Sequence, residues 1–95
     1  VWVTLKMKVK QGVFHHLSDF LTANLPNVRG FEGALKVNLF YDPDSQTFLL
    51  HEEWASKEHH QAYIKFIQER GVMQDLLAFM ESEPEVTYYN RLMML

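Results

Sequence analysis

The chain has 95 residues, a formal net charge of −3, 47% hydrophobic residues and no cysteine. This length and apolar content predict one folded domain over residues 1–95, and the missing cysteine excludes disulfides, thiolate metal sites and cysteine nucleophiles. Charges of both signs are interspersed, and no apolar run approaches the ~20 residues of a membrane-spanning helix. We therefore expect a cytoplasmic protein that binds neither nucleic acid nor a membrane.

The first part of the chain predicts a strand, a helix and a second strand. Residues 1–10, VWVTLKMKVK, alternate between apolar and polar side chains, which is the pattern of a half-buried strand. Over residues 14–28 the apolar side chains recur every three or four positions, as on an amphipathic helix, and Pro26 lies near the end of this helix. A second alternating strand is predicted over residues 34–41, with Leu35 on its apolar face.

The second part of the chain begins with a hairpin and returns to helices. The turn DPDS at residues 42–45 joins the second strand to a third, because proline and aspartate both favour a tight turn. Ser56 is placed to cap the N-terminus of the helix that follows. The remaining elements are predicted in chain order as a strand over 46–54, a helix over 57–70, a short helix over 72–80 and a strand over 86–92.

This order of elements predicts an α+β, ferredoxin-like fold made of two split βαβ halves. Helices would cover one face of a four-stranded antiparallel sheet. The other face would carry Trp2, Phe40 and either Leu49 or the alternating set of Phe48, Leu50 and Trp54. An apolar sheet face of roughly 400–500 Å² is near the limit that a soluble monomer exposes. We therefore expect a homodimer in which two copies pack sheet against sheet, forming a dimeric α/β barrel.

Several short motifs resemble the antibiotic biosynthesis monooxygenase family, and together they extend over nearly the whole chain. They are Gly12 after the first strand, FEGAL at residues 31–35, DPD at 42–44, EEW at 52–54 and SKE at 56–58. In family members that act as enzymes, the resemblance implies oxidation of small phenolic or quinol-like aromatics by O₂ without metal, flavin or haem. The substrate would lie in a pocket between the sheet and the helices.

The resemblance implies that the protein removes a proton from an electron-rich phenol, whose anion then reacts with O₂. This chemistry needs a base or hydrogen-bond acceptor in an apolar pocket. Many members of the family carry a histidine nine residues after the tryptophan of the third strand, where this chain has Tyr63. Two alternatives therefore remain open: a non-catalytic dimer that binds a small hydrophobic aromatic ligand or assists another protein, and a lyase or isomerase on the same barrel.

His51 and Tyr63 are the candidate catalytic residues. Histidine is the side chain best suited to proton transfer near neutral pH, and a tyrosine on the second predicted helix can direct its hydroxyl into a pocket. Each has an alternative structural role, as an interface histidine and as a buried tyrosine bonded to a neighbour. Because successive residues of a strand point to opposite faces, His51 shares its face with Glu53 and not with Glu52.

Four further residues are candidates for holding the substrate. Glu52 is either a pocket carboxylate whose pKa is raised by burial or a structural group bonded to the backbone or to a cation such as Arg70 or Arg91. The other three are Asn38, whose amide could hold a substrate oxygen, and the aromatic residues Trp54 and Phe66. The adjacent histidines at 15–16 and 59–60 point about 100° apart on a helix, so we expect no metal site.

Overall fold

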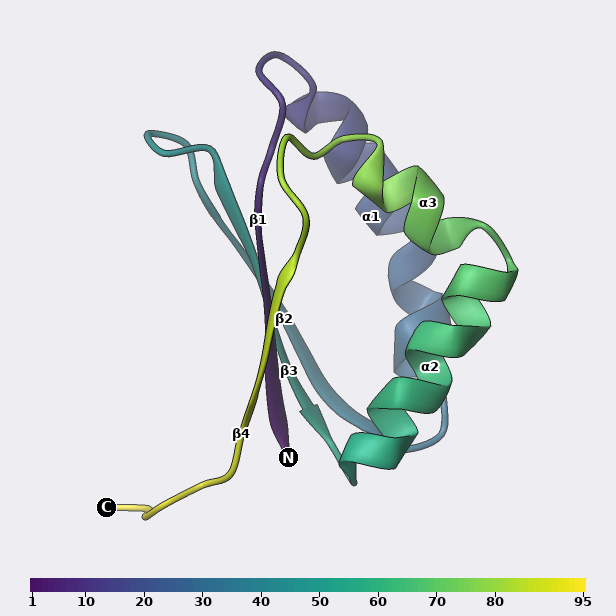
Figure 1. The fold of residues 1–95 in the computed structure, drawn as a ribbon, viewed down its shortest axis with the longest axis vertical. Coiled ribbons are helices and arrows are strands. Elements are labelled where there is room, and N and C mark those ends of the chain that lie inside the picture. The colour runs from purple at the N-terminus through teal and green to yellow at the C-terminus, as the bar shows by residue number, and fades with distance from the viewer.

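The computed structural model describes residues 1–95, and its helices all lie on one side of a single sheet (Figure 1). The sheet is antiparallel with strand order β2-β3-β1-β4, which confirms the predicted ferredoxin-like α+β fold. None of the helices is both long enough and apolar enough to cross a bilayer. The elements are β1 Trp2–Lys8, α1 Phe14–Arg29, β2 Ala34–Asp42, β3 Thr47–Trp54, α2 Lys57–Glu69, α3 Val72–Leu77 and β4 Glu85–Tyr89.

The core lies between the two central strands and the helices. On β1 the alternation predicted from the sequence places Val3, Leu5 and Met7 inward, and all three are buried. They belong to the same apolar cluster as Phe48 and Trp54 of β3. Burying an aliphatic or aromatic side chain of this size contributes about 1.5–3 kcal/mol, so this cluster holds β3, and any site built on it, in a fixed position.

The start of α2 is fixed by a cap and by a close approach to β2. The hydroxyl of Ser56 accepts a hydrogen bond from the backbone N–H of His59 at 3.1 Å, as predicted for an N-cap. Gly33 has a φ of +90°, and a Cβ at this position would overlap the His59 ring. A glycine is therefore required where the chain enters β2, and α2 can lie directly over this end of the sheet.

The prediction for Leu35 is wrong. Its side chain is 59% exposed instead of lying on the apolar face. The pairing of β2 with β3 shifts register between Ala34 and Lys36, and such a bulge interrupts the alternation on which the prediction depended. From Val37 onwards the alternation resumes as predicted.

The last helix and the last strand both end earlier than predicted. Helix α3 ends at Leu77, and the chain is already extended at Met80, which forms an isolated β-bridge with Val9. Strand β4 ends at Tyr89 because its partner there is Trp2, the first residue of β1, so no neighbouring strand continues beyond this pair.

We call the side of the sheet turned away from the helices the open face (Figure 1). Register partners point to the same side of a sheet, and the strand pairings therefore place the predicted apolar residues on this face. Phe40 and Tyr89 are each 53% exposed there. The residues of the open face include Trp2, Thr4, Lys6, Asn38, Phe40, Leu49, His51, Glu53 and Tyr89.

Candidate functional site

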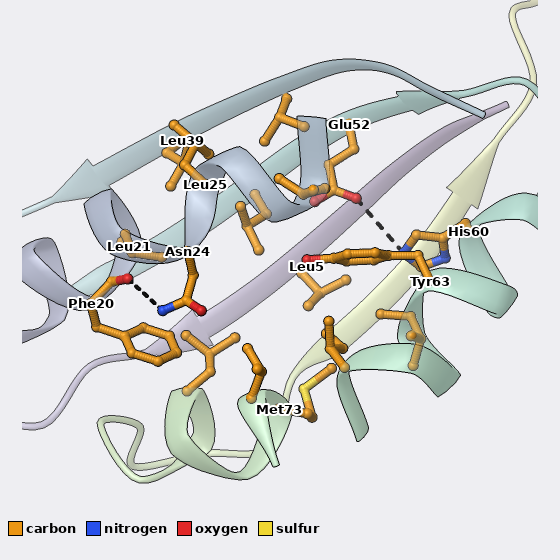
Figure 2. Close-up of a pocket in the computed structure, with 17 residues that line it drawn as sticks. Leu5, Phe20, Leu21, Asn24, Leu25, Leu39, Glu52, His60, Tyr63 and Met73 are labelled. Atoms are coloured by element: carbon orange, nitrogen blue, oxygen red, sulfur yellow. Dashed lines mark hydrogen bonds and ion pairs between the residues drawn. The ribbon is translucent and has the colours of Figure 1, made fainter. Parts of the chain in front are cut away.

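A cavity of about 70 Å³ lies between the sheet and the three helices (Figure 2). Of its 17 lining residues, 14 are hydrophobic. The sheet contributes Leu5 and Leu39, while the helices contribute residues such as Leu25, Ile67 and Met73. An apolar cavity with few polar groups is the usual form of a site for a small organic molecule, so those polar groups indicate its chemistry.

Glu52 is the buried carboxylate of this cavity. It is 5% exposed and points inward from β3 together with Trp54. Its Oε1 accepts a hydrogen bond of 2.8 Å from the indole Nε1 of Trp54, and neither Arg70 nor Arg91 pairs with it, since both lie over aromatic rings elsewhere. Burial raises the pKa of the Glu52 carboxyl, and the hydrogen bond from Trp54 opposes this effect only in part.

His60 reaches Glu52 from α2. Its Nε2 lies 3.8 Å from Glu52 Oε1, and its Nδ1 lies 2.8 Å from the hydroxyl of Tyr88 on β4. The side chain is 1% exposed, and burial lowers the pKa of the imidazole from its ordinary value of 6.5 to about 4. His60 is therefore uncharged at neutral pH, and it connects the carboxylate of the cavity to a hydroxyl on β4.

Tyr63 lies one helical turn after His60 and directs its hydroxyl into the cavity (Figure 2). Burial, together with the charge of Glu52, raises the pKa of Tyr63 to about 12, so the hydroxyl stays protonated. Neither this hydroxyl nor Oε2 of Glu52 has a hydrogen-bond partner in the protein, and no fully buried polar side-chain atom lacks one. Both atoms therefore keep surface that faces the cavity, one as an acceptor and one as a donor for a ligand hydroxyl.

Among the residues predicted from the sequence, the structure brings Glu52 and Tyr63 together but does not bring His51 to them. His51 and Asn38 are register partners on the open face, where the His51 ring stacks on Trp2 with centroids 5.0 Å apart. The sheet lies between them and the cavity, because alternate residues of a strand point to opposite faces. A single site containing both His51 and Tyr63 is therefore not formed within one chain.

Trp54 and Phe66 do not line the cavity, although both were predicted to contact a substrate. The Trp54 ring lies behind the site, with its centroid 5.4 Å from that of Tyr63. The Phe66 ring packs against Phe31 with centroids 5.3 Å apart. The Trp54 ring supports Tyr63, which lines the cavity, whereas the Phe66 ring packs against Phe31, which does not.

His60 and Asn24 are cavity residues that the sequence-based prediction missed. The spacing of α2 already placed His60 on the same inward stripe as Tyr63, which is the signal that could have identified it. Asn24 of α1 donates a hydrogen bond of 2.9 Å to the carbonyl of Phe20. Its spacing from Leu21 and Val28 placed it on the apolar stripe of that helix, which is the signal that could have identified it. No three His, Asp or Glu side chains come together in an arrangement that could hold a metal ion.

The free energy of unfolding is expected to depend on pH through His60 and Glu52, in opposite directions. The lowered pKa of His60 means that stability is lost as the pH falls from 6.5 to about 4, by up to about 3 kcal/mol, because the unfolded chain takes up a proton that the folded chain does not. Because the pKa of Glu52 is raised above its ordinary value of 4.5, its contribution to stability is complete below pH 4.5. This contribution is lost as the pH rises through the pKa of Glu52 in the folded protein.

Urea denaturation at a series of pH values, followed by circular dichroism, measures both contributions. We expect His60→Phe to lose the acid-side decline and Glu52→Gln to lose the decline at higher pH. A His60→Phe variant with the same pH dependence as the unmodified protein would contradict this assignment.

The fold and the cavity define an α+β protein with a ferredoxin-like sheet, helices on one face and a small apolar site between the two layers. The family model described as antibiotic biosynthesis monooxygenase matches residues 1–65. The chain therefore belongs to the antibiotic biosynthesis monooxygenase family, as the motifs in its sequence predicted. No curated protein matches the chain in sequence.

Solved structures agree with this chain in fold. An antibiotic biosynthesis monooxygenase superposes with a TM-score of 0.84 at 14% identity, covering 96% of this chain and 97% of its own. A conserved protein from Methanosarcina mazei Go1 gives 0.83 at 15% identity, with 95% and 90% covered. A monooxygenase from the gene ActVA-Orf6 of Streptomyces coelicolor, in complex with nanaomycin D, gives 0.79 at 14% identity, with 99% and 89% covered.

Proposed function

We propose that the protein is a cofactor-independent monooxygenase that oxidises a small phenolic or quinol-like aromatic with O₂. The observation that carries this proposal is the pair of unpaired oxygen atoms, Oε2 of Glu52 and the hydroxyl of Tyr63, which face one apolar cavity. Apolar walls suit an aromatic ring, and a buried carboxylate suits removal of a phenolic proton. Membership of the family supports the same reaction class.

In the proposed reaction Glu52 accepts the proton of the substrate hydroxyl. Its raised pKa brings it closer to neutral pH, where a general base works best. Tyr63 remains protonated and donates a hydrogen bond to the phenolate oxygen, which stabilises the developing charge. The electron-rich ring then reacts with O₂. One oxygen atom of O₂ forms a carbonyl group at a ring carbon that carried a hydrogen. The other oxygen atom leaves as water, which takes the hydrogen of that ring carbon and the hydrogen of the phenolic hydroxyl.

His60 and Tyr88 give the proton a path out of the cavity. The distances are 3.8 Å from Glu52 Oε1 to His60 Nε2 and 2.8 Å from His60 Nδ1 to the Tyr88 hydroxyl. Tyr88 is half-buried and lines a groove on the surface. We propose that Glu52 returns to its ionised form through this chain, after a small side-chain movement closes the longer gap.

Oxygen uptake by the purified protein tests the proposed activity. The protein is mixed with a panel of dihydroxynaphthalenes and quinols in an oxygen electrode, and the spontaneous rate of each compound is subtracted. We expect at least one compound to be oxidised well above its spontaneous rate. Consumption no faster than the spontaneous rate across the whole panel would contradict the proposal.

A non-catalytic binding protein is the second candidate function. It is favoured by Tyr63, which stands where many members of the family carry a histidine. A small aromatic molecule retained in native mass spectrometry, together with no oxygen uptake across the same panel, would select this alternative over the monooxygenase.

We propose that the open face pairs with the open face of a second copy. Apolar side chains are concentrated there, and Leu49 is already half-buried in the single chain. The segment after β4 leaves the sheet on the side away from the helices (Figure 1), and its Leu92 is 95% exposed. Together these surfaces are near the largest apolar patch that monomers usually expose, and a second copy would cover them.

Leu49→Lys is expected to convert the dimer to a monomer, because it places a charge at the centre of a buried apolar interface. Analytical ultracentrifugation at micromolar concentration measures the change. Ala62→Lys is the matched control, since Ala62 is exposed on α2 at the opposite side of the molecule. A monomeric unmodified protein at this concentration would contradict the proposed assembly.

A further inference from the structure

We propose that a surface groove between α2, α3 and β4 is the entrance and the outer half of the ligand site, and that it holds an anionic substituent of a two-ring aromatic ligand. This inference rests on the proposed function, because it assigns the phenolic ring of the same ligand to the cavity. The groove has a volume of about 370 Å³ and opens beside exposed Gln61, Lys65 and Gln68 of α2 and Val86 of β4.

The groove and the cavity are separated by side chains that line both. These are Leu5, Ile64 and Met73, each of which contacts the cavity on one side and the groove on the other. Met73 lies at the edge of the cavity across from Glu52 (Figure 2). A molecule that passes this partition from the groove would therefore approach Glu52 directly.

The size of the cavity requires the partition to move. The cavity measures about 70 Å³, whereas an engineered protein cavity that binds benzene measures about 150 Å³. Leu5 is held on the central strand, and Ile64 is β-branched and stiff. Met73 is unbranched and belongs to a short helix, so it is the side chain that can swing aside. A ring that displaces Met73 then extends from the cavity into the groove.

The charges of the groove indicate what its outer end would bind. Lys65 is the one charged residue among those that line it, and the lysine forms no ion pair with the protein. Gln61 and Gln68 lie four positions before and three positions after it, on the same side of α2. The outer end of the groove thus presents a cation and two amides, although the chain as a whole has a net charge of −3. A carboxylate or another oxyanion on the ligand complements this end, while the phenolic hydroxyl complements Glu52 and Tyr63.

Isothermal titration calorimetry with three probes tests the charge. The probes are phenol, a naphthol, and a hydroxynaphthoate whose hydroxyl and carboxylate lie at opposite ends of the fused rings. We expect the hydroxynaphthoate to bind about fivefold more tightly than the naphthol, as for one partly exposed ion pair. Lys65→Gln should abolish this difference. Lys10→Gln, which changes an exposed lysine outside the groove, should preserve it.

Two further variants test the route. Val86→Trp fills the groove and should weaken both two-ring probes by about tenfold, while phenol changes by less than about twofold. Ala62→Trp adds the same ring on α2 outside the groove and should leave all three unchanged. Met73→Ala removes the movable side chain of the partition and should speed association of the two-ring probes by about tenfold. Met80→Ala is the control for loss of a buried methionine. Thermal melting by circular dichroism establishes that each variant is folded.

The outcomes separate this inference from the proposed function. If phenol binds, but Lys65→Gln and Val86→Trp leave the affinities of the two-ring probes unchanged, the groove has no role in binding. The proposal that the cavity binds a phenol is then unaffected. If none of the three probes binds the unmodified protein, the cavity is not a site for phenols, and both proposals are overturned.

Discussion

Glu52→Gln is expected to lower kcat/KM for the O₂-dependent oxidation by about 10³-fold, within the range typical of losing a general base. The amide keeps the shape of the side chain, and its oxygen can still accept the hydrogen bond that Trp54 Nε1 donates to Oε1 at 2.8 Å. It cannot accept the phenolic proton. Tyr63→Phe should cost about 10²-fold, because it removes one hydrogen-bond donor to the developing anion. Initial rates in an oxygen electrode measure both effects.

Two companion variants make this result specific. Glu69→Gln neutralises an exposed carboxylate near the end of α2 and should leave kcat/KM unchanged. His51→Gln tests the histidine that the sequence favoured, and we expect its rate to stay within about threefold of the unmodified protein, well short of the loss of a general base. If Glu52→Gln retains the full rate while His51→Gln loses it, the assignment of the base to the cavity is wrong.

Trp54→Ala is expected to lower the free energy of unfolding by about 4–5 kcal/mol. Trp54 is 1% exposed and its ring contacts those of Phe31, His60 and Tyr63, and truncation of a core aromatic typically costs about 3–5 kcal/mol. The loss also leaves a buried oxygen of Glu52 without its donor, which costs about 1–3 kcal/mol. Urea denaturation followed by circular dichroism measures the change at fixed protein concentration.

Trp54→Phe separates the two contributions. It keeps an aromatic ring in the core but removes the indole N–H, so we expect a loss of about 2 kcal/mol and a further rise in the pKa of Glu52, because the hydrogen bond from Trp54 lowers that pKa. Ala62→Gly on the exposed side of α2 is the surface control and should cost about 1 kcal/mol. A change below this control value in Trp54→Ala would show that the tryptophan does not hold the core together.

The sequence predicted the fold well because its strongest patterns are local. The alternation of β1 and the change to a helical period at Phe14 each depend on neighbouring residues alone, and Ser56 caps α2 where predicted. The same alternation separated Glu52 from His51 and placed them on opposite faces. One exception is Leu35, because a bulge inserts one residue without any local signal in the sequence. The others are the ends of α3 and β4, which lie earlier than their patterns predicted.

The site was predicted only in part because it depends on contacts between distant elements. Glu52 and Tyr63 were identified singly, yet their convergence with His60 requires the rotation of α2 about its axis and its position over β3. His60 meets Tyr88, which is 28 residues away along the chain. No spacing rule in the sequence records that distance, so His60 was not identified as the partner of Glu52.

The position of a bound phenol tests the central claim most directly. A crystal structure of the protein soaked with a phenol that O₂ does not oxidise would locate the ligand without any assumption about catalysis. We predict its ring in the cavity and its oxygen about 2.6–3.2 Å from both the Glu52 carboxylate and the Tyr63 hydroxyl. A phenol bound instead on the open face, against His51 and Asn38 with the cavity empty, would contradict the account.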